Sequence, residues 1–416
     1  MDLRQLTVCA SRFGGMCFRG AKMIRRYSNN IAMLPYFFAG ALLGWAMFDY
    51  DGDVIWLALG PFVVALWAMS STRCTAWLVM FGYYLGAGRG LFAGGGVFFA
   101  DKGVFSLGDG LLIWIGPALM LSSVWAILWG RASILFRSLI AIVLVAVPPF
   151  GIIGWGSPVL AAGTWFPGMG LAGLLLMLLV IGLMAKMAQG NQGRYTWWSL
   201  SSLISVSLVC NALYVSPVKG DWVGVNTDFG DGSKQTSFVG ISRLQDSLLT
   251  QRTKVSVWPE AAGGWWDVNE AFLSAADDEM KTQKRSALIG AHRVVNGLYV
   301  NVVESVGAES GVEWHSRMVV PLSMWRPWAS QGEKWAVDWT GSGVKRFQGK
   351  KVGVLICYDQ VIVWPAILTM IDKPDVLIGV SNGWWSKETA ATGAQMASMG
   401  SWARLSGLPM VTARNE

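Results

Sequence analysis

The sequence predicts a bundle of membrane-spanning helices followed by an α/β domain, and three features indicate this. First, only 14% of the 416 residues are charged and 53% are hydrophobic, whereas soluble proteins usually carry about 25% charged residues. Second, charges are sparse between Ile31 and Val215 and become ordinary from about Lys219. Third, beyond Lys219 short apolar strands alternate with amphipathic helices, which favours a layered α/β domain. The predicted parts are a basic segment over 1–30, a bundle over 31–215 and an α/β domain over 216–416.

Seven apolar runs approach the length of about 20 residues that a spanning helix needs. They cover 31–48, 54–71, 76–99, 111–129, 134–154, 170–187 and 196–215. The third run is the least regular, because seven glycines surround Arg89. We expect that run to be broken or re-entrant, with its freed backbone buried in protein or lining a wet cavity. Pro148 and Pro149 should kink or end the fifth run.

Basic residues are distributed unevenly between the two sides of this bundle. Six lie in the first 26 residues, and the loops on the same side add Arg73, Arg131, Arg137, Lys186 and Arg194. The opposite loops contain only Lys102. Basic loops stay in the cytoplasm, so the N-terminus is predicted to be cytoplasmic and the α/β domain to lie outside it. Topology accounts for much of the net charge of +7, which is therefore no signal for nucleic-acid binding. The first 30 residues lack a cleavable signal pattern, so the first span is expected to remain as an anchor.

Polar residues follow three predicted strands of the α/β domain, where open α/β sheets usually place their sites. Glu260 follows the strand near 254–258, Cys357 ends the strand near 352–357, and Asn382 follows the strand near 376–381. A thiol becomes a useful nucleophile beside a base or a cation, and a carboxylate of raised pKa can be that base. The simpler interpretation is a buried apolar cysteine and a solvated or capping carboxylate.

The order of these motifs resembles the nitrilase (carbon–nitrogen hydrolase) superfamily, in which a Glu, a Lys and a Cys follow one another. The matching passages are Trp258-Pro259-Glu260, Ile356-Cys357-Tyr358-Asp359, and Ser381-Asn382 with Trp384. A membrane bundle joined to such a domain is similar to the apolipoprotein N-acyltransferases, as are the passages 154–158 and 395–415. The resemblance implies an α-β-β-α sandwich in the periplasm, anchored in a bacterial inner membrane. It also implies acyl transfer from a phospholipid or other membrane lipid to an amine, through a thioacyl enzyme on Cys357.

Three departures from the acyltransferase pattern narrow the resemblance. The family Lys position falls on Ser316, with Arg317 beside it, and Asp359 replaces a Glu. The chain stops at Glu416, before the last strands of the family domain, so the sandwich is expected to be C-terminally truncated. Together with the passage 321–328, these departures resemble the TraB family of conjugal transfer proteins. That resemblance implies partners in a conjugation system.

Three functional interpretations remain open from the sequence. The first is an acyltransferase with an altered triad of Glu260, Arg317 and Cys357, although neighbours on an extended segment face opposite ways and Arg differs from Lys in shape. The second is a non-catalytic scaffold or assembly component of a conjugation system. The third is a Cys–His hydrolase using His292 or His315, which neither histidine's context favours.

Substrate contacts are predicted for residues beside the motifs and for one arginine of the bundle. They are Tyr358, Asp359, Asn382, Trp384, Trp258 and, for an anionic headgroup, Arg89. Neighbouring tryptophans could line an apolar groove, and core packing is the alternative for them, as snorkelling is for Arg89. No cluster of metal ligands is evident, and Gly94-Gly95-Gly96 lacks the strand and helix of a nucleotide loop. No metal or other cofactor is therefore predicted.

Overall fold

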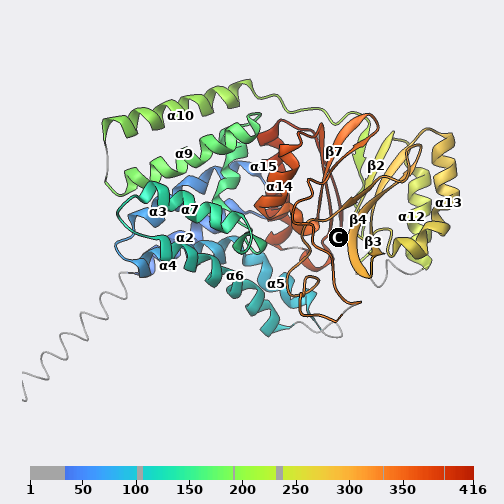
Figure 1. Cartoon of the computed structure of the whole chain (residues 1–416), viewed down its shortest axis with the longest axis horizontal. Helices are drawn as coiled ribbons and strands as arrows, with labels where there is room; N and C mark the ends of the chain where they lie inside the picture. Colours follow the sequence, from blue (N-terminus) through green and yellow to red (C-terminus); the bar gives the residue numbers. More distant parts are fainter. Residues whose placement is uncertain (1–32, 101–105, 191–192, 231–237, 331, 388) are drawn as a thin grey trace, which may run out of the picture.

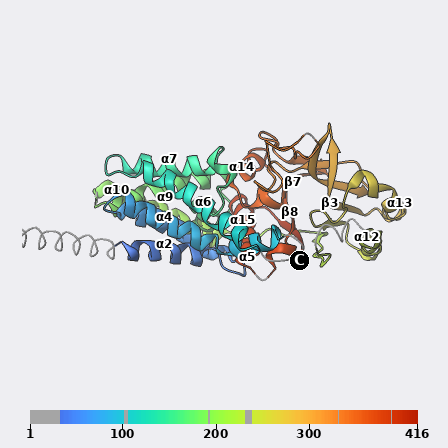
Figure 2. The same cartoon turned by 90° about the horizontal axis from the view of Figure 1, so that it is seen from below.

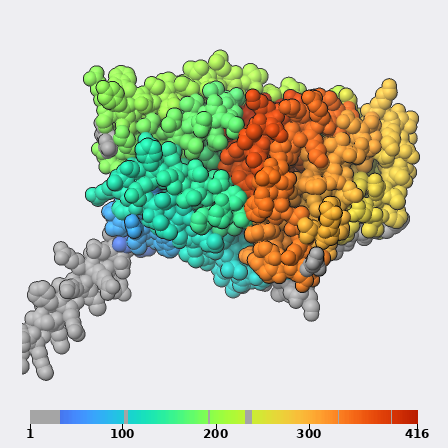
Figure 3. Space-filling view, in the orientation of Figure 1, coloured from blue at the N-terminus to red at the C-terminus, as the bar shows by residue number. Residues whose placement is uncertain are grey.

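The computed structural model describes residues 33–100, 106–190, 193–230, 238–330, 332–387 and 389–416, and the predicted basic segment over 1–30 lies outside them. A helical part, coloured blue to green, lies beside a sandwich of two sheets, coloured yellow to red (Figure 1). The space-filling view shows the two parts in continuous contact along their boundary (Figure 3). Residues of both parts can therefore line a site at this boundary.

The helical part follows the predicted apolar runs. Its helices are α2 (Leu34–Met47), α3 (Gly60–Met69) after the 3-10 turn η1 (Val54–Leu59), α4 (Arg73–Ala87), α5 (Arg89–Phe98), α6 (Leu107–Leu128), α7 (Ile134–Ala146), α9 (Gly170–Ala188) and α10 (Arg194–Leu213). Among the described residues, α6, α9 and α10 are long and apolar enough to cross a membrane, while the apolar helices Leu34–Met47, Val54–Met69 and Ile134–Ala146 are shorter. The third predicted run is broken, as expected, because α4 ends and α5 begins at Gly88.

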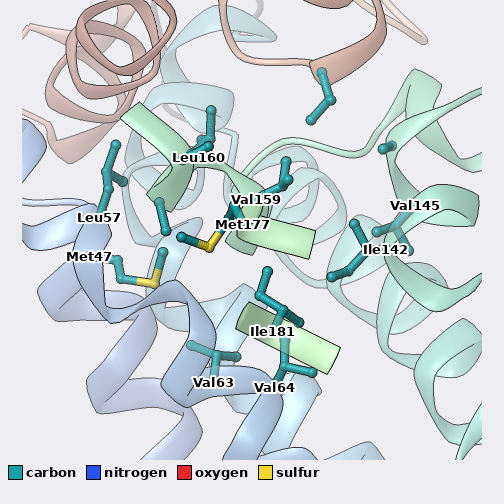
Figure 4. Close-up of a cluster of buried hydrophobic side chains, with 14 of the residues drawn as sticks. Met47, Leu57, Val63, Val64, Ile142, Val145, Val159, Leu160, Met177 and Ile181 are labelled. Atoms are coloured by element: carbon teal, nitrogen blue, oxygen red, sulfur yellow. The ribbon is translucent and has the colours of Figure 1, made fainter. Parts of the chain in front are cut away.

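The prolines of the fifth run end its helix, because α7 stops at Ala146 and Pro148 and Pro149 follow. The chain then returns through η3 (Phe150–Ile152), η4 (Pro158–Ala161) and α8 (Ala162–Trp165). Figure 4 shows Leu160 of η4 among the buried side chains of η1, α3 and α9. The 154–158 passage thus belongs largely to the buried centre of the bundle.

Helices α2 and α4 approach so closely that their backbones touch through glycines. A Cβ atom on Gly40 would lie 2.0 Å from the Val79 oxygen, and one on Gly82 would lie 2.2 Å from the Phe37 oxygen. Small residues allow this approach, which is a common way of packing helices in membranes. The glycines therefore determine how closely α2 and α4 pack.

The sandwich contains two sheets that face each other. The first has the order β1 (Trp222–Gly224), β2 (Val255–Trp258), β3 (Ser286–Val295), β4 (Leu298–Gly307) and β5 (Glu313–His315), and the second has the order β6 (Val344–Phe347), β7 (Lys350–Ile356), β8 (Val376–Asn382) and β9 (Met410–Asn415). Strands β1 to β3 and β7 to β9 run parallel, whereas β3 to β5 and β6 to β7 are antiparallel. Alternate apolar side chains such as Val257, Val303 and Val354 fill the space between the sheets.

Helices cover both outer faces, so the predicted α-β-β-α layering is confirmed. Helices α12 (Phe238–Thr250) and α13 (Trp266–Thr282) pack on the first sheet. Helices α14 (Val363–Ile371) and α15 (Ala390–Ser406) pack on the second sheet, and their far sides join the buried core of the bundle (Figure 2). Because α14 and α15 belong to both parts, the end of β7 lies next to the membrane helices.

We predict that Gly82→Ala destabilises the protein and that Gly108→Ala does not. A methyl group at position 82 collides with the α2 backbone, and overpacking of this kind costs about 1–3 kcal/mol. A Cβ atom at Gly108 of α6 meets nothing within 4 Å, so alanine there improves only helix propensity. Thermal unfolding of the two detergent-solubilised variants compares them. Equal midpoints would contradict the close α2–α4 contact.

Candidate functional site

Cys357 lies where strand β7 ends and a 3-10 turn, η5 (Cys357–Gln360), begins. Its φ of +46° is a left-handed conformation, which is uncommon outside glycine and is often found at functional sites. The Gln395 amide of α15 donates a hydrogen bond of 3.0 Å to the Cys357 carbonyl. The residue as a whole is partly exposed. The thiol therefore lies on a sharp turn that a hydrogen bond from α15 holds in place.

Glu260 follows β2 and reaches Cys357 from the opposite sheet. The residue is only 4% exposed, and its carboxylate accepts hydrogen bonds from the Cys357 thiol and the Asn301 amide. The Asn382 backbone N–H donates a third, of 3.0 Å. The structure therefore brings together Glu260, Cys357 and Asn382, which the sequence places on three strand ends.

Burial raises the pKa of both members of this pair. For Glu260, desolvation outweighs the hydrogen bonds from Cys357, Asn301 and Asn382, which lower its pKa. For Cys357, desolvation raises the pKa well above its usual range, and the adjacent Glu260 charge raises it further. The resting cysteine is consequently a thiol at neutral pH. Glu260 is in contact with that thiol and is placed to accept its proton.

Arg317 and Asp359 form a fully buried pair behind the thiol. The Arg317 Nη2 atom lies 3.5 Å from the Asp359 Oδ2 atom, and both side chains are 0% exposed. The same guanidinium donates to the Val354 carbonyl at 2.9 Å. Asp359 also accepts the backbone N–H groups of residues 317, 318 and 356. The pair therefore connects the 316–318 segment to the end of β7.

An apolar cavity of about 440 Å³ opens beside Cys357. On the sandwich side, Cys357, Tyr358, Asn382 and Trp385 line it. On the membrane side its walls come from α5, α6 and the loop after α7, including Leu91, Gly95, Phe98, Leu112, Ile113, Gly116, Met120 and Ile153. The Tyr358 hydroxyl joins the two sides by donating to the Ile152 carbonyl at 2.9 Å. An apolar chain among the membrane helices could thus reach the thiol.

The other predicted contact residues lie outside the cavity. Trp258 is fully buried, and its indole donates to Ser256. Trp384 stacks on Phe98 with ring centroids 6.2 Å apart, while its neighbour Trp385 lines the cavity. Arg89 donates to the Trp45 and Gly86 carbonyls and lies over the Trp45 and Tyr50 rings. These contacts match core packing for Trp258 and local anchoring for Arg89.

The cavity walls in the described part of the chain contain no Lys or Arg, and the guanidinium of Arg317 is not among them. The predicted role of Arg317 as an oxyanion donor therefore lacks a supporting contact. The N–H of Tyr358 is in the first turn of η5, where helical N–H groups have no partner within the helix. That N–H, which follows Cys357 directly in the chain, is a candidate donor for an oxyanion formed there.

Both histidines lie away from the thiol. The His292 ring packs against Trp265 and Trp335, and burial lowers its pKa to about 4. His315 pairs with Glu313. Neither ring lines the cavity or is a partner of Cys357 among the described interactions. This arrangement gives no support to a Cys–His hydrolase.

Sequence reasoning missed several residues of the site. Asn301 holds Glu260, but a single Asn in an apolar strand carries no motif. Gln395 braces the thiol turn from a helix that comes later in the chain. The loop over 320–328, whose aromatic and proline content was visible, contributes Val320, Pro321, Leu322, Trp325 and Trp328 to the cavity. Across the described residues, no group of three or more potential ligands could hold a metal ion.

Comparison with known proteins gives two kinds of match. The "Probable conjugal transfer protein TraB" of Sinorhizobium fredii is 32% identical over 388 residues, covering 88% of this chain and 94% of that protein. The "Conjugal transfer protein TraB" of Agrobacterium fabrum is 31% identical over 456 residues, covering 99% and 98%. No family model matches the chain.

Solved structures with a matching part are more distant. A carbon–nitrogen hydrolase of Helicobacter pylori G27 has 16% identity and a TM-score of 0.34, covering 46% of this chain and 72% of that one. An amidase of Nesterenkonia sp. has 9% identity and a TM-score of 0.27, covering 39% and 63%.

Together, the apolar helices and the α-β-β-α sandwich with a Glu–Cys pair define a membrane-associated protein with a two-sheet sandwich domain. Identity of more than 30% over most of the chain then settles the family. The chain belongs to the TraB family of conjugal transfer proteins.

We predict that Arg317→Met is strongly destabilising. It leaves the Asp359 carboxylate buried without its cation, and breaking a buried pair in this way typically costs about 3–5 kcal/mol. The control is Lys387→Met, which removes an exposed pair with Asp228, and such surface pairs contribute roughly 0–1 kcal/mol. Denaturant or thermal unfolding measures both variants. Equal losses would show that the Arg317–Asp359 pair does not hold the turn.

We predict that Glu260→Gln lowers the apparent pKa of Cys357. The Glu260 charge raises the pKa of the thiol, so its removal stabilises the thiolate relative to the thiol. The pH midpoint of Cys357 alkylation, followed by mass spectrometry of its peptide, should move to lower pH. An unchanged midpoint would mean that the carboxylate and the thiol are not in contact.

Proposed function

We propose that the chain is a membrane-embedded thiol acyltransferase in which Cys357 accepts an acyl group from a membrane lipid. The observation that carries the proposal is the contact of Cys357 with Glu260 at the wall of an apolar cavity shared with α5 and α6. Pockets of this kind, apolar with a few convergent polar groups, are typical of ligand sites. The cavity suits an acyl chain, while the polar groups meet only at its sandwich end.

The chemistry follows from the placed groups. Glu260 takes the thiol proton while the sulfur attacks the ester carbonyl of the lipid, and the Tyr358 N–H faces the oxyanion. The C–O bond then breaks, and the leaving alcohol receives the proton from Glu260. In the second half, Glu260 takes a proton from an amine that attacks the thioester. The C–S bond breaks, an amide forms and the thiol is restored.

The proposed setting comes from the basic residues and from the relatives. The Lys and Arg bias of the bundle favours a cytoplasmic N-terminus and a periplasmic sandwich in a bacterial inner membrane. The relatives are named as conjugal transfer proteins, which favours a role beside the proteins of a conjugation system. In this setting the acyl donor comes from the surrounding bilayer.

A second candidate is a non-catalytic, lipid-binding component of the conjugation system. It is favoured by the absence of Lys and Arg from the described cavity walls, because losing an oxyanion donor commonly costs about 100- to 1000-fold in rate. In that case the cavity would hold an acyl chain without forming a thioester. The following experiment separates the two candidates.

We predict that the purified protein forms a thioester on Cys357 when it is incubated with phospholipid vesicles. Cys357→Ala should abolish it, and Glu260→Gln should slow it about 100-fold or more, because the proton acceptor is lost. Gly116→Trp should also suppress it by filling the cavity, since a Cβ atom there meets only Leu112, at 3.9 Å. Gly108→Trp, on the same helix in open space, is the matched control.

Mass spectrometry of the Cys357 peptide, with hydroxylamine release, measures the thioester. Bound lipid without thioester would exclude acyl transfer and favour the binding component. Mating assays with donor cells carrying Cys357→Ala then compare the two roles in plasmid transfer. An unchanged frequency of plasmid transfer with this variant would show that the function does not require the thiol.

A further inference from the structure

Two buried polar atoms beside Glu260 have no hydrogen-bond partner among the described residues. They are the Asn301 Oδ1 and Ser316 Oγ atoms. The residues are only 2% and 4% exposed. Burying a polar group without a partner costs free energy, so such atoms usually face a bound water, ion or ligand. The pair therefore marks a place that another group can fill.

The strand register places both atoms on the same face of the first sheet. Val302 pairs with His315, and the Ser316 N–H donates to the Asn301 carbonyl at 2.9 Å, so Asn301 lies opposite Ser316. Directly opposed residues have Cβ atoms about 4.5–5.5 Å apart on one face. The Asn301 amide donates to Glu260 on that face. Asn301 thus lies between Ser316, its partner across the two strands, and Glu260, which its amide contacts.

Among the described residues, no cation pairs with Glu260. The hydrogen bonds of Glu260 come from an amide, a backbone N–H and a thiol, which are all neutral donors. The other charged groups near it are Asp359, a second carboxylate, and Arg317, whose guanidinium is directed to Asp359. A buried carboxylate without a cation is unfavourable when ionised. A cationic occupant is therefore preferred to a neutral one.

We propose that Glu260, Asn301 and Ser316 form a subsite for a primary ammonium group. An ammonium group offers three N–H donors, which match the three oxygen acceptors, whereas a water offers two donors and no charge. Cys357 and Asn382 both line the cavity and both bond to Glu260, so the subsite lies directly behind the cavity wall. This inference rests on the proposed function in one respect, because it assigns the bound group to the amine that receives the acyl chain.

The chemistry at this subsite balances with the acyl transfer above. The ammonium gives one proton to Glu260, and the free amine attacks the thioester carbonyl on Cys357. The new C–N bond forms as the C–S bond breaks. The nitrogen loses its remaining extra proton to solvent, and the thiolate takes the proton held by Glu260. Ser316 and Asn301 act as binding residues for the amine in this step.

Methylammonium chloride is the probe, and tetramethylammonium chloride at the same ionic strength is its control, because it carries charge without N–H donors. The full chain in detergent is alkylated across a pH series, and the Cys357 peptide is quantified by mass spectrometry. A bound cation beside the thiol favours the thiolate, so methylammonium should lower the pH midpoint by about one unit. Tetramethylammonium should leave the midpoint unchanged.

Two variants test the assigned residues. Ser316→Ala removes one acceptor and should reduce the methylammonium shift severalfold. Ser316→Lys places an ammonium in the subsite from within, so its midpoint should be low without any amine and should not respond to methylammonium. Ser310→Lys adds the same charge on an exposed residue and should behave as the unmodified protein. If Ser316→Lys does not fold, the titrations of the unmodified protein and of Ser316→Ala still decide.

Equal effects of the two ammonium salts would overturn the subsite and leave water as its occupant. A full methylammonium shift in Ser316→Ala would overturn the assignment of Ser316. Neither measurement uses an acyl group, so the two proposals can fail separately. If no thioester forms on Cys357, acyl transfer is excluded but the ammonium subsite is not. If methylammonium does not change the pH midpoint of alkylation, the subsite is excluded but acyl transfer is not.

Discussion

Helix α15 is the constraint on which the arrangement of the site depends. Eleven of its 17 residues are buried and none is fully exposed, because one side covers the second sheet and the other packs into the bundle. Its backbone touches the bundle directly: a Cβ atom on Gly163 would lie 2.2 Å from the Ser401 oxygen, and one on Gly393 would lie 2.1 Å from the Asp49 oxygen. Such contacts leave no room for sliding. Gln395 of the same helix donates a hydrogen bond to the Cys357 carbonyl. Helix α15 therefore holds the thiol in a fixed position relative to the membrane helices.

The charged and polar groups of the site form two separate pairs, one on each side of the thiol turn. Arg317 and Asp359 neutralise each other behind the turn, and Gly343, with a φ of +65°, makes room for the guanidinium, since a Cβ atom there would lie 1.4 Å from Nη1. In front of the turn, Glu260 and Cys357 face each other with neutral hydrogen-bond donors around them. Arg317, which was predicted to serve catalysis, pairs with Asp359 and does not line the cavity. In the described part of the chain, no other Lys or Arg lines the cavity beside the thiol.

The sequence predicted the layers because they follow from short-range signals. It placed Glu260 and Cys357 at strand ends, whereas their pairing was expected from the order of the motifs, which resembles that of the nitrilase superfamily. Apolar runs, alternating strands and a carboxylate or thiol at a strand end are all readable locally. The side chain of Arg317 was harder, since its direction depends on Asp359, 42 residues later. Asn301 and Gln395 gave no signal, because each acts through one contact made only after the sheets and α15 assemble. The choice of Trp385 over Trp384 likewise depends on a 3-10 turn whose phase no pattern reveals.

The raised pKa of Cys357 also affects how readily the residue would be oxidised in the periplasmic setting proposed above. Oxidants react with the thiolate, and a cysteine that stays protonated is a poor target for them. The apolar walls around the sulfur and the adjacent Glu260 both hold the proton in place. Desolvation thus keeps the cysteine protonated when no substrate is bound, and it slows oxidation in the compartment proposed for it. The sandwich contains no second cysteine with which Cys357 could form a disulfide.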